Sequence, residues 1–147
     1  MKFEIKEFNQ LSTTELYSIL KIRQEVFIIE QNCNYLDCDG LDLKAIHMSL
    51  NRGGELIAYL RMIKPNILSE NIVLGRILVS INERNKNIGK EMMLQVINFL
   101  EKQYPNLSIE MSAQSYLIDF YNQFGFNIIG EEYLDDNIPH MKMIKKR

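Results

Sequence analysis

The feature that most constrains the fold is a nearly continuous run of aliphatic residues, Ile72-Val73-Leu74-Gly75-Arg76-Ile77-Leu78-Val79. Such a run is typical of a strand buried on both faces of its sheet. After a short Asn-rich loop, apolar residues recur at spacings of three and four from Ile88 to Leu100, which predicts a long amphipathic helix. Together with the order of the elements described next, these two segments indicate an α/β fold with a mixed central sheet flanked by helices.

The remaining elements are predicted from local patterns. Alternating residues 3–6 favour a strand, and Ser12 with Glu15 three residues later marks the start of a helix that continues to about Ile29. Residues 32–44 form an acidic stretch without a period, which we interpret as an ordered loop. Further strands are expected at 48–50, 56–63, 107–111, 126–129 and 141–144, with a short helix at 117–124. The predicted order is β-α-β-β-β-α-β-α-β-β.

Composition restricts the classes of protein to consider. A chain of 147 residues without repeat or linker corresponds to a single domain, residues 1–147. A net charge of -2 argues against a nucleic-acid partner, and no apolar stretch approaches the roughly 20 residues of a membrane span. The first residues lack the apolar core of a signal peptide. Because Cys33 and Cys38 are too few to staple such a domain, we interpret them as reduced thiols and expect a soluble, cytoplasmic protein.

The junction from Val79 to Lys90 carries the most functional information. A buried strand leads into a loop rich in Asn and Gly, which opens directly onto the long helix. Backbone N–H groups that converge at a helix N-terminus form a cradle for phosphate, and Arg84, Lys86 and Lys90 add positive charge there. The stretch is neither a Walker loop nor a GxGxxG fingerprint, and taken alone it also fits a plain strand-to-helix turn.

Two motifs together resemble the GNAT acetyltransferases. Arg84-x-x-Asn87-x-Gly89 is similar to the pyrophosphate loop of that family, and Tyr121, four residues before Gly125-Phe126, is similar to its second signature. The segment from Glu30 to Asp42, His47 and the late Ile138-Pro139-His140 resemble the ElaA-like branch. The resemblance covers essentially the whole chain. It implies the GNAT acyl-CoA N-acyltransferase fold and an enzyme that moves an acetyl group from acetyl-CoA to a primary amine, on a small molecule or peptide of unknown identity.

The resemblance also implies positions for the site. In the family, backbone groups of the central strand hold the pantetheine arm and polarise the thioester, and a tyrosine protonates the departing sulfur; here these are residues 77–79 and Tyr121. From the sequence alone, Tyr121 between Phe120 and Phe124 also fits a packing residue. The expected CoA-binding residues are Ile77, Leu78, Val79, Arg84, Asn85, Lys86, Asn87, Ile88, Gly89, Lys90, Gln114 and Tyr121.

The general base is the main departure from the family pattern. Histone-type relatives carry a Glu eleven residues before the first residue of the loop motif, and Val73 stands at that position here. Glu110, His140, His47 and Glu30 are the candidates, and solvent water is an alternative. His140 is the preferred candidate, because it follows Pro139 near the last strand pair and histidine ordinarily titrates near neutral pH, but a structural role for this residue stays open. Glu110 is instead expected to be a solvent-facing charge on its strand.

Two questions stay open at this stage. The acidic residues Asp37, Asp39 and Asp42 either border an acceptor cleft, where they favour a cationic amine, or belong to a solvated loop held by Asx turns. Neither they nor the two cysteines and two histidines have the spacing of a calcium or zinc site, so we expect no metal. The alternative function is a weakened CoA-binding or protein-interaction module on the same fold, and a homodimer is also considered.

Overall fold

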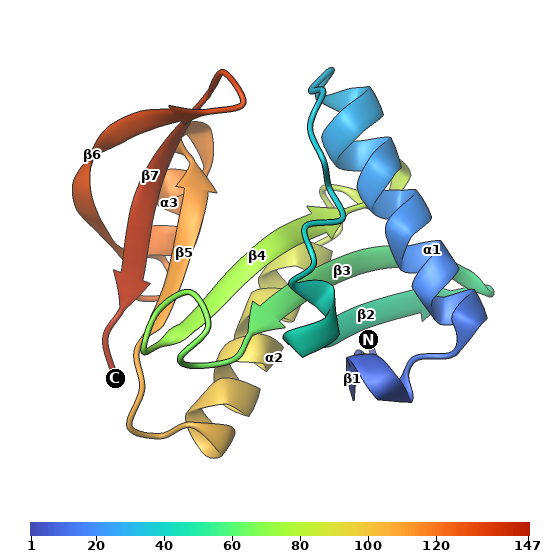
Figure 1. Ribbon diagram of the computed structural model, residues 1–147, viewed down its shortest axis with the longest axis horizontal. Helices are drawn as coiled ribbons and strands as arrows, with labels where there is room; N and C mark the ends of the chain where they lie inside the picture. The colour runs from blue at the N-terminus through green and yellow to red at the C-terminus, as the bar shows by residue number, and fades with distance from the viewer.

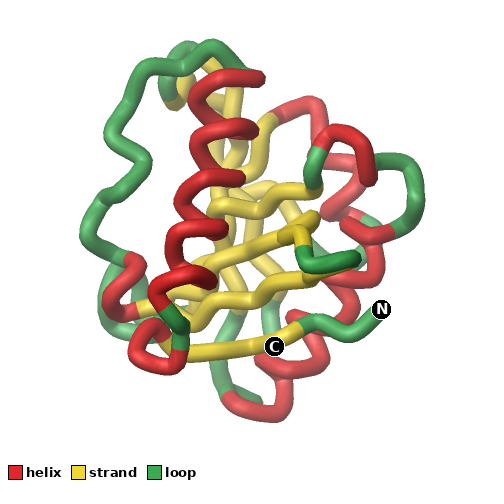
Figure 2. The backbone as a smooth tube through the Cα atoms, turned by 90° about the vertical axis from the view of Figure 1, so that its right-hand side faces the viewer, coloured by secondary structure: helices red, strands yellow, loops and turns green.

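The computed structural model of the chain describes all residues 1–147 as one mixed sheet of seven strands with helices on both sides (Figures 1 and 2). The strands are β1 (Glu4–Glu7), β2 (Ala45–Arg52), β3 (Glu55–Ile63), β4 (Ile72–Val79), β5 (Ile109–Gln114), β6 (Asn127–Asp135) and β7 (Ile138–Lys145). The α-helices are α1 (Thr13–Arg23), α2 (Ile88–Gln103) and α3 (Ile118–Asn122). The element order predicted from the sequence is confirmed, as is the fold class.

The strands lie in the order β1-β2-β3-β4-β5-β7-β6, and the β4–β5 pair is parallel whereas every other pair is antiparallel. The parallel pair requires a crossover, which α2 supplies by packing on one face of the sheet. Helix α1 lies on the opposite face, so that the sheet separates the two (Figure 2). No helix has the length and apolar character needed to cross a membrane.

The first helix begins as predicted and changes character near its end. Ser12 Oγ accepts a hydrogen bond from Glu15 N at 3.0 Å, and Glu15 Oε1 accepts one from Ser12 N at 2.8 Å. The two bonds together form a capping box. The predicted single helix to about Ile29 is instead α1 followed by a wider π-helical segment, η2 (Gln24–Glu30). The combined helix therefore ends one residue from the predicted position.

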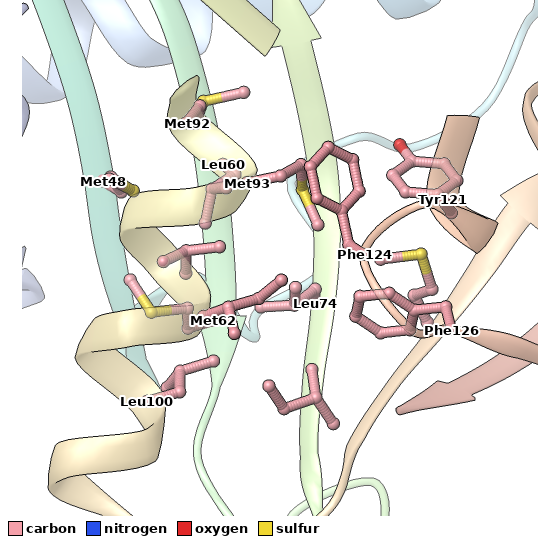
Figure 3. Close-up of a cluster of buried hydrophobic side chains, with 14 of the residues drawn as sticks. Met48, Leu60, Met62, Leu74, Met92, Met93, Leu100, Tyr121, Phe124 and Phe126 are labelled. Atoms are coloured by element: carbon pink, nitrogen blue, oxygen red, sulfur yellow. The ribbon is translucent and has the colours of Figure 1, made fainter. Parts of the chain in front are cut away.

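A hydrophobic core fills the space between the sheet and α2. Met92, Met93 and Leu100 on α2 are at most 1% exposed and belong to one cluster with the inward-facing residues of β2 to β5 (Figure 3). Phe124 and Phe126 extend this cluster toward α3. A smaller cluster beneath α1 contains Ile19, Ile22 and Tyr59. Because the two clusters cover both faces of β3 and β4, the sequences of these strands are nearly continuous runs of apolar residues.

The sheet opens between β4 and β5, and this opening positions the site. Their pairing covers only Ile72↔Ile109, Val73↔Glu110 and Leu74↔Met111. Beyond Leu74, β4 carries a bulge opposite β3, where Arg76 adopts the left-handed conformation with φ of 49°. From residue 75 onward, the edge of β4 that faces β5 therefore has no strand partner.

The last hairpin is longer than predicted. Strands β6 and β7 extend beyond the expected 126–129 and 141–144 and meet in a tight turn, in which Asp136 and Asn137 have φ of 49° and 63°. Every residue of β6 is exposed. The strand therefore lacks the alternation of apolar and polar residues by which a half-buried strand is recognised in a sequence.

Candidate functional site

An open cleft of about 760 Å³ lies between the end of β4, the N-terminus of α2 and the segment 114–123. Every residue expected to bind CoA lines this outer cleft except Lys86. The structure therefore brings together the strand end, the Asn-rich loop and Tyr121, which are far apart in the sequence.

The loop that opens onto α2 has the backbone of a phosphate cradle. Asn85 and Asn87 both adopt the left-handed conformation, with φ of 64° and 63°, which Asn tolerates better than most other residues. Asn87 is the N-cap of α2 but caps it with no side-chain bond. The first N–H groups of the helix have no partner within it, and residues 88–90 line the cleft. This end of α2 carries partial positive charge and free donors.

The three cations near the loop differ in their surroundings. Arg84 Nε donates to Val79 O at 3.0 Å, and its two terminal nitrogens bind both carboxylate oxygens of Glu30 at 2.7 and 2.9 Å. Lys86 pairs with Glu83 at 3.1 Å and does not line the cleft. Lys90 lines the cleft and makes no ion pair, so its charge is the one free to meet an anion there.

A smaller pocket of about 270 Å³ adjoins the outer cleft on the α1 side of the sheet. Its floor is formed by β4, β5 and β7, and its walls by the segment after η2 and the β6–β7 hairpin tip. Figure 1 shows these two segments at the same edge of the molecule, and Cys33 Sγ lies 3.8 Å from Asp136 O. Residues that line both the inner pocket and the outer cleft are Phe27, Gln31, Ile77, Gln114, Leu117 and Tyr121.

Tyr121 stands where the two cavities meet. Its side chain is 5% exposed, and its ring makes edge contacts with Phe120 and Phe126 at centroid distances of 5.1 and 6.4 Å. No protein group bonds to its hydroxyl, whose oxygen points away from Phe126 (Figure 3). Burial raises the pKa of the phenol above its ordinary value, so it is protonated at neutral pH. Tyr121 is thus both a packing residue and a free proton donor.

His140 lines the inner pocket, and a hydrogen bond to a backbone carbonyl determines its tautomer. Its Nδ1 is 2.6 Å from Ile138 O, a group that only accepts, so Nδ1 carries the proton and Nε2 keeps its lone pair. The ring stacks on Tyr133 at 6.1 Å, and His140 pairs across the sheet with Gln114 on one side and Tyr133 on the other. His140 therefore presents a proton-accepting nitrogen in the pocket that Tyr121 also lines.

The other three candidates for the general base, Glu110, His47 and Glu30, are held by hydrogen bonds to protein groups. Glu110 is 8% exposed rather than solvent-facing, and it accepts from Ser69 and Asn71 at the closed end of the β4–β5 pair. Burial favours its neutral form, but these bonds outweigh burial and hold its pKa below the ordinary value. His47 is buried between Tyr59 Oη and Asp42 O at 2.6 and 2.9 Å, and burial lowers its pKa. Neither residue lines a pocket, and Glu30 is occupied by Arg84.

The acidic loop shows only part of each arrangement expected for it. Asp37 and Asp42 are 7% and 8% exposed, so the loop is not simply solvated, although Asp39 does form the expected Asx turn with Leu41 N. Their carboxylates are not free to bind an amine, because arginines neutralise them. Arg23, which is fully buried, contacts Asp37 and Asp42 at 2.8 and 2.7 Å.

Two further arginines complete this network. Arg61 binds Asp39 and Asp42 at 2.8 Å, and Arg76 contacts Asp37 and Asp39 at 2.8 and 3.3 Å. Arg76 is the left-handed residue of the β4 bulge, and its guanidinium also lies over the Tyr35 ring at 5.5 Å. The network therefore ties the loop that walls the inner pocket to the bulge that opens the sheet.

Several of these residues were not predicted as part of the site. The three network arginines and the hairpin-tip Asp135 and Asp136 carry no local motif. A signal for the bulge was present, because an isolated Gly75 within a strand pattern suggests one. The four candidate zinc ligands are not brought together, since His47 lies in the interior whereas His140 lines the pocket. Cys33 and Cys38 are free thiols.

Comparison with known proteins identifies the family of the chain. Residues 42–147 match the family model of the acetyltransferase (GNAT) domain. A UPF0039 protein of Synechocystis is 38% identical over 95% of this chain and 91% of its own length, and protein ElaA of Escherichia coli is 36% identical over 94% and 92%. The crystal structure of a Pseudomonas aeruginosa protein described as an acyl-CoA N-acyltransferase superposes with a TM-score of 0.94 at 35% identity and covers 99% of both chains. The chain therefore belongs to the GNAT acetyltransferase family and, within it, to the ElaA-like proteins.

Proposed function

We propose that this protein transfers an acetyl group from acetyl-CoA to a primary amine by direct attack. The observation that carries the proposal is the meeting of two cavities at the unpartnered hydroxyl of Tyr121. One cavity has the donors for a pyrophosphate, and the other has a proton-accepting histidine. An acyl donor and an amine placed in the two cavities come together at Tyr121.

The outer cleft fits the donor substrate. Its pyrophosphate would lie on the N–H groups of residues 85–90, beside Lys90, at the positive end of α2. The open edge of β4 offers unpaired backbone groups to the amide groups of a pantetheine arm, as a neighbouring strand would. Backbone N–H groups at residues 77–79 supply donors for the thioester oxygen as it gains negative charge.

The proton transfers are assigned to the two side chains at the junction. His140 Nε2 accepts the proton from the attacking nitrogen as its bond to the carbonyl carbon forms. The carbon–sulfur bond then breaks, and Tyr121 donates its proton to the departing thiolate. The phenolate that remains recovers a proton from solvent. This assignment needs no carboxylate at Val73, which lines the inner pocket as an apolar residue.

The experiment that tests the proposal measures release of free CoA thiol when the protein is mixed with acetyl-CoA and a panel of primary amines. Acetyl-CoA binding is measured separately by thermal shift, where saturation to 100 times Kd adds about 2.7 kcal/mol of stability. Thiol release with product acetylation supports the proposal. Binding without turnover of any amine would instead support the weakened CoA-binding module, and absence of both would remove CoA from the account.

The free thiols of Cys33 and Cys38 support a reducing compartment, and we accordingly propose a cytoplasmic location. A test is to compare thiol accessibility in freshly lysed and in oxidised cells. Thiols that are already blocked in the fresh lysate would contradict the assignment.

A further inference from the structure

The inner pocket is lined by positive and negative side chains, and the negative ones at the β6–β7 hairpin tip have no ion-pair partner. Arg61 and Arg76 contribute to the lining, but the network of three arginines and three aspartates to which they belong carries no net charge. Asp135 and Asp136, at the tip of the β6–β7 hairpin, also line the pocket. Their carboxylates make no ion pair. The uncompensated charge of the pocket is therefore negative and lies at the hairpin tip.

The hairpin register fixes where this charge lies relative to His140. Tyr133 pairs with His140, and Asp135 pairs with Ile138. Because side chains two residues apart point to the same face of a strand, Asp135 shares the pocket face with Tyr133 and His140. Asp135 is thus the diagonal neighbour of His140, at about 7 Å between Cβ atoms. Asp136 follows in the turn, where its left-handed backbone suits Asp or Asn.

A second observation is that an unpartnered polar group lines the same pocket. The Tyr121 hydroxyl is on a side chain that is 95% buried, lines the same pocket and has no protein partner. A ligand in the pocket thus has Tyr121 and His140 on one part of its lining and the hairpin-tip residues Asp135 and Asp136 on another. An α-amino acid has its own carboxylate beside the reacting amine and would meet repulsion at that wall.

Building on the proposed function, we infer that the acceptor is a short diamine or polyamine whose distal ammonium group binds Asp135 and Asp136 while its other nitrogen, as the neutral amine, meets His140. The distal ammonium group is selected by charge rather than by shape, because both carboxylates are exposed. An exposed pair of this kind contributes modestly, and we expect a preference of about fivefold over an uncharged amine of the same length.

Three compounds that differ only at the far end test this inference. The compounds are 1,4-diaminobutane, 1-aminobutane and 4-aminobutanoate, whose distal groups are positive, neutral and negative. We expect kcat/KM for CoA release to fall in that order, with the diamine about fivefold above the monoamine. In the double variant Asp135→Asn, Asp136→Asn the three values should converge to within about twofold. Asn keeps the left-handed turn, so the hairpin is preserved.

Glu131→Gln is the matched control, because Glu131 lies on the same exposed strand, makes no ion pair and lines neither pocket. The Glu131→Gln variant should keep the wild-type preference for 1,4-diaminobutane over 1-aminobutane and 4-aminobutanoate. Equal kcat/KM values for the three compounds, or a preference that survives the double substitution, would overturn the inference.

Calorimetric titration of the same three compounds into the CoA-bound protein separates the inference from the proposed function. The binding order should match the kinetic order even where turnover is slow. Ordered binding without CoA release under any condition would refute the acetyltransferase proposal and leave the diamine site standing. Equal binding of the three compounds, or no binding, would refute the diamine site.

Discussion

Replacing Tyr121 with Phe removes one oxygen atom at the junction of the two cavities and leaves the packing in place. The ring contacts with Phe120 and Phe126 are retained, and no protein hydrogen bond is lost. We therefore expect the free energy of unfolding to change by less than about 1 kcal/mol. The loss of a positioned proton donor should lower kcat by about 100- to 10,000-fold, which corresponds to about 2.7–5.4 kcal/mol of activation free energy.

The assay follows CoA thiol release under saturating acetyl-CoA and amine, together with the Kd for acetyl-CoA and a urea unfolding curve. The Kd should stay within about twofold of wild type, because the hydroxyl acts on the departing sulfur rather than on the bound donor. Tyr17→Phe is the control, since Tyr17 is 74% exposed on α1 and lines neither pocket. A Tyr121→Phe variant with kcat within threefold of wild type would refute the assignment and leave Tyr121 as a packing residue.

The remaining predictions concern the base, the phosphate site and the buried network. His140→Gln should lower kcat about 100-fold or more, whereas a kcat within about threefold of wild type would favour solvent water as the base. Lys90→Glu should raise the Kd for acetyl-CoA about tenfold, and Lys86→Glu should raise it less because Lys86 does not line the cleft and is paired with Glu83; equal effects would contradict the geometry. Arg61→Met should cost about 3–5 kcal/mol in urea unfolding, because it leaves buried carboxylates without their partner, and a cost below 1 kcal/mol would show that the network is dispensable. Burial raises the pKa of Asp39, but the Arg61 guanidinium outweighs it and lowers that pKa to about 2, so its stabilising contribution is complete above the unfolded value near 4 and should be lost between about pH 4 and pH 2 in acid titrations.

The parts of the fold that depend on local periodicity could be predicted from the sequence. The run at 72–79 corresponds to β4 at both ends, and α2 begins at Ile88 as its spacing indicates. The Asn-rich loop between them adopts the left-handed geometry that Asn permits. These features depend on neighbours a few residues away, which a single sequence displays directly.

The features that the sequence does not reveal depend on contacts between distant residues. The arginines of the buried network come from α1, β3 and β4, and nothing local marks Arg23, Arg61 or Arg76 as partners of one acidic loop. Without knowledge of those partners, the sequence leaves open whether the acidic residues are solvated or border a cleft, whereas Asp37 and Asp42 are in fact buried against arginines. Strand β6 was predicted too short for a related reason, because an edge strand exposed on both faces has no buried positions to set its pattern.

The central claim is that two cavities meet at Tyr121 so that an acyl group passes between their ligands there. A crystal structure with CoA and 1,4-diaminobutane tests it most directly. The account predicts the pyrophosphate on the backbone N–H groups of residues 85–90, the sulfur within hydrogen-bond distance of the Tyr121 hydroxyl, and one amine nitrogen facing His140 Nε2. A CoA bound outside the outer cleft, or a sulfur directed away from Tyr121, would contradict it.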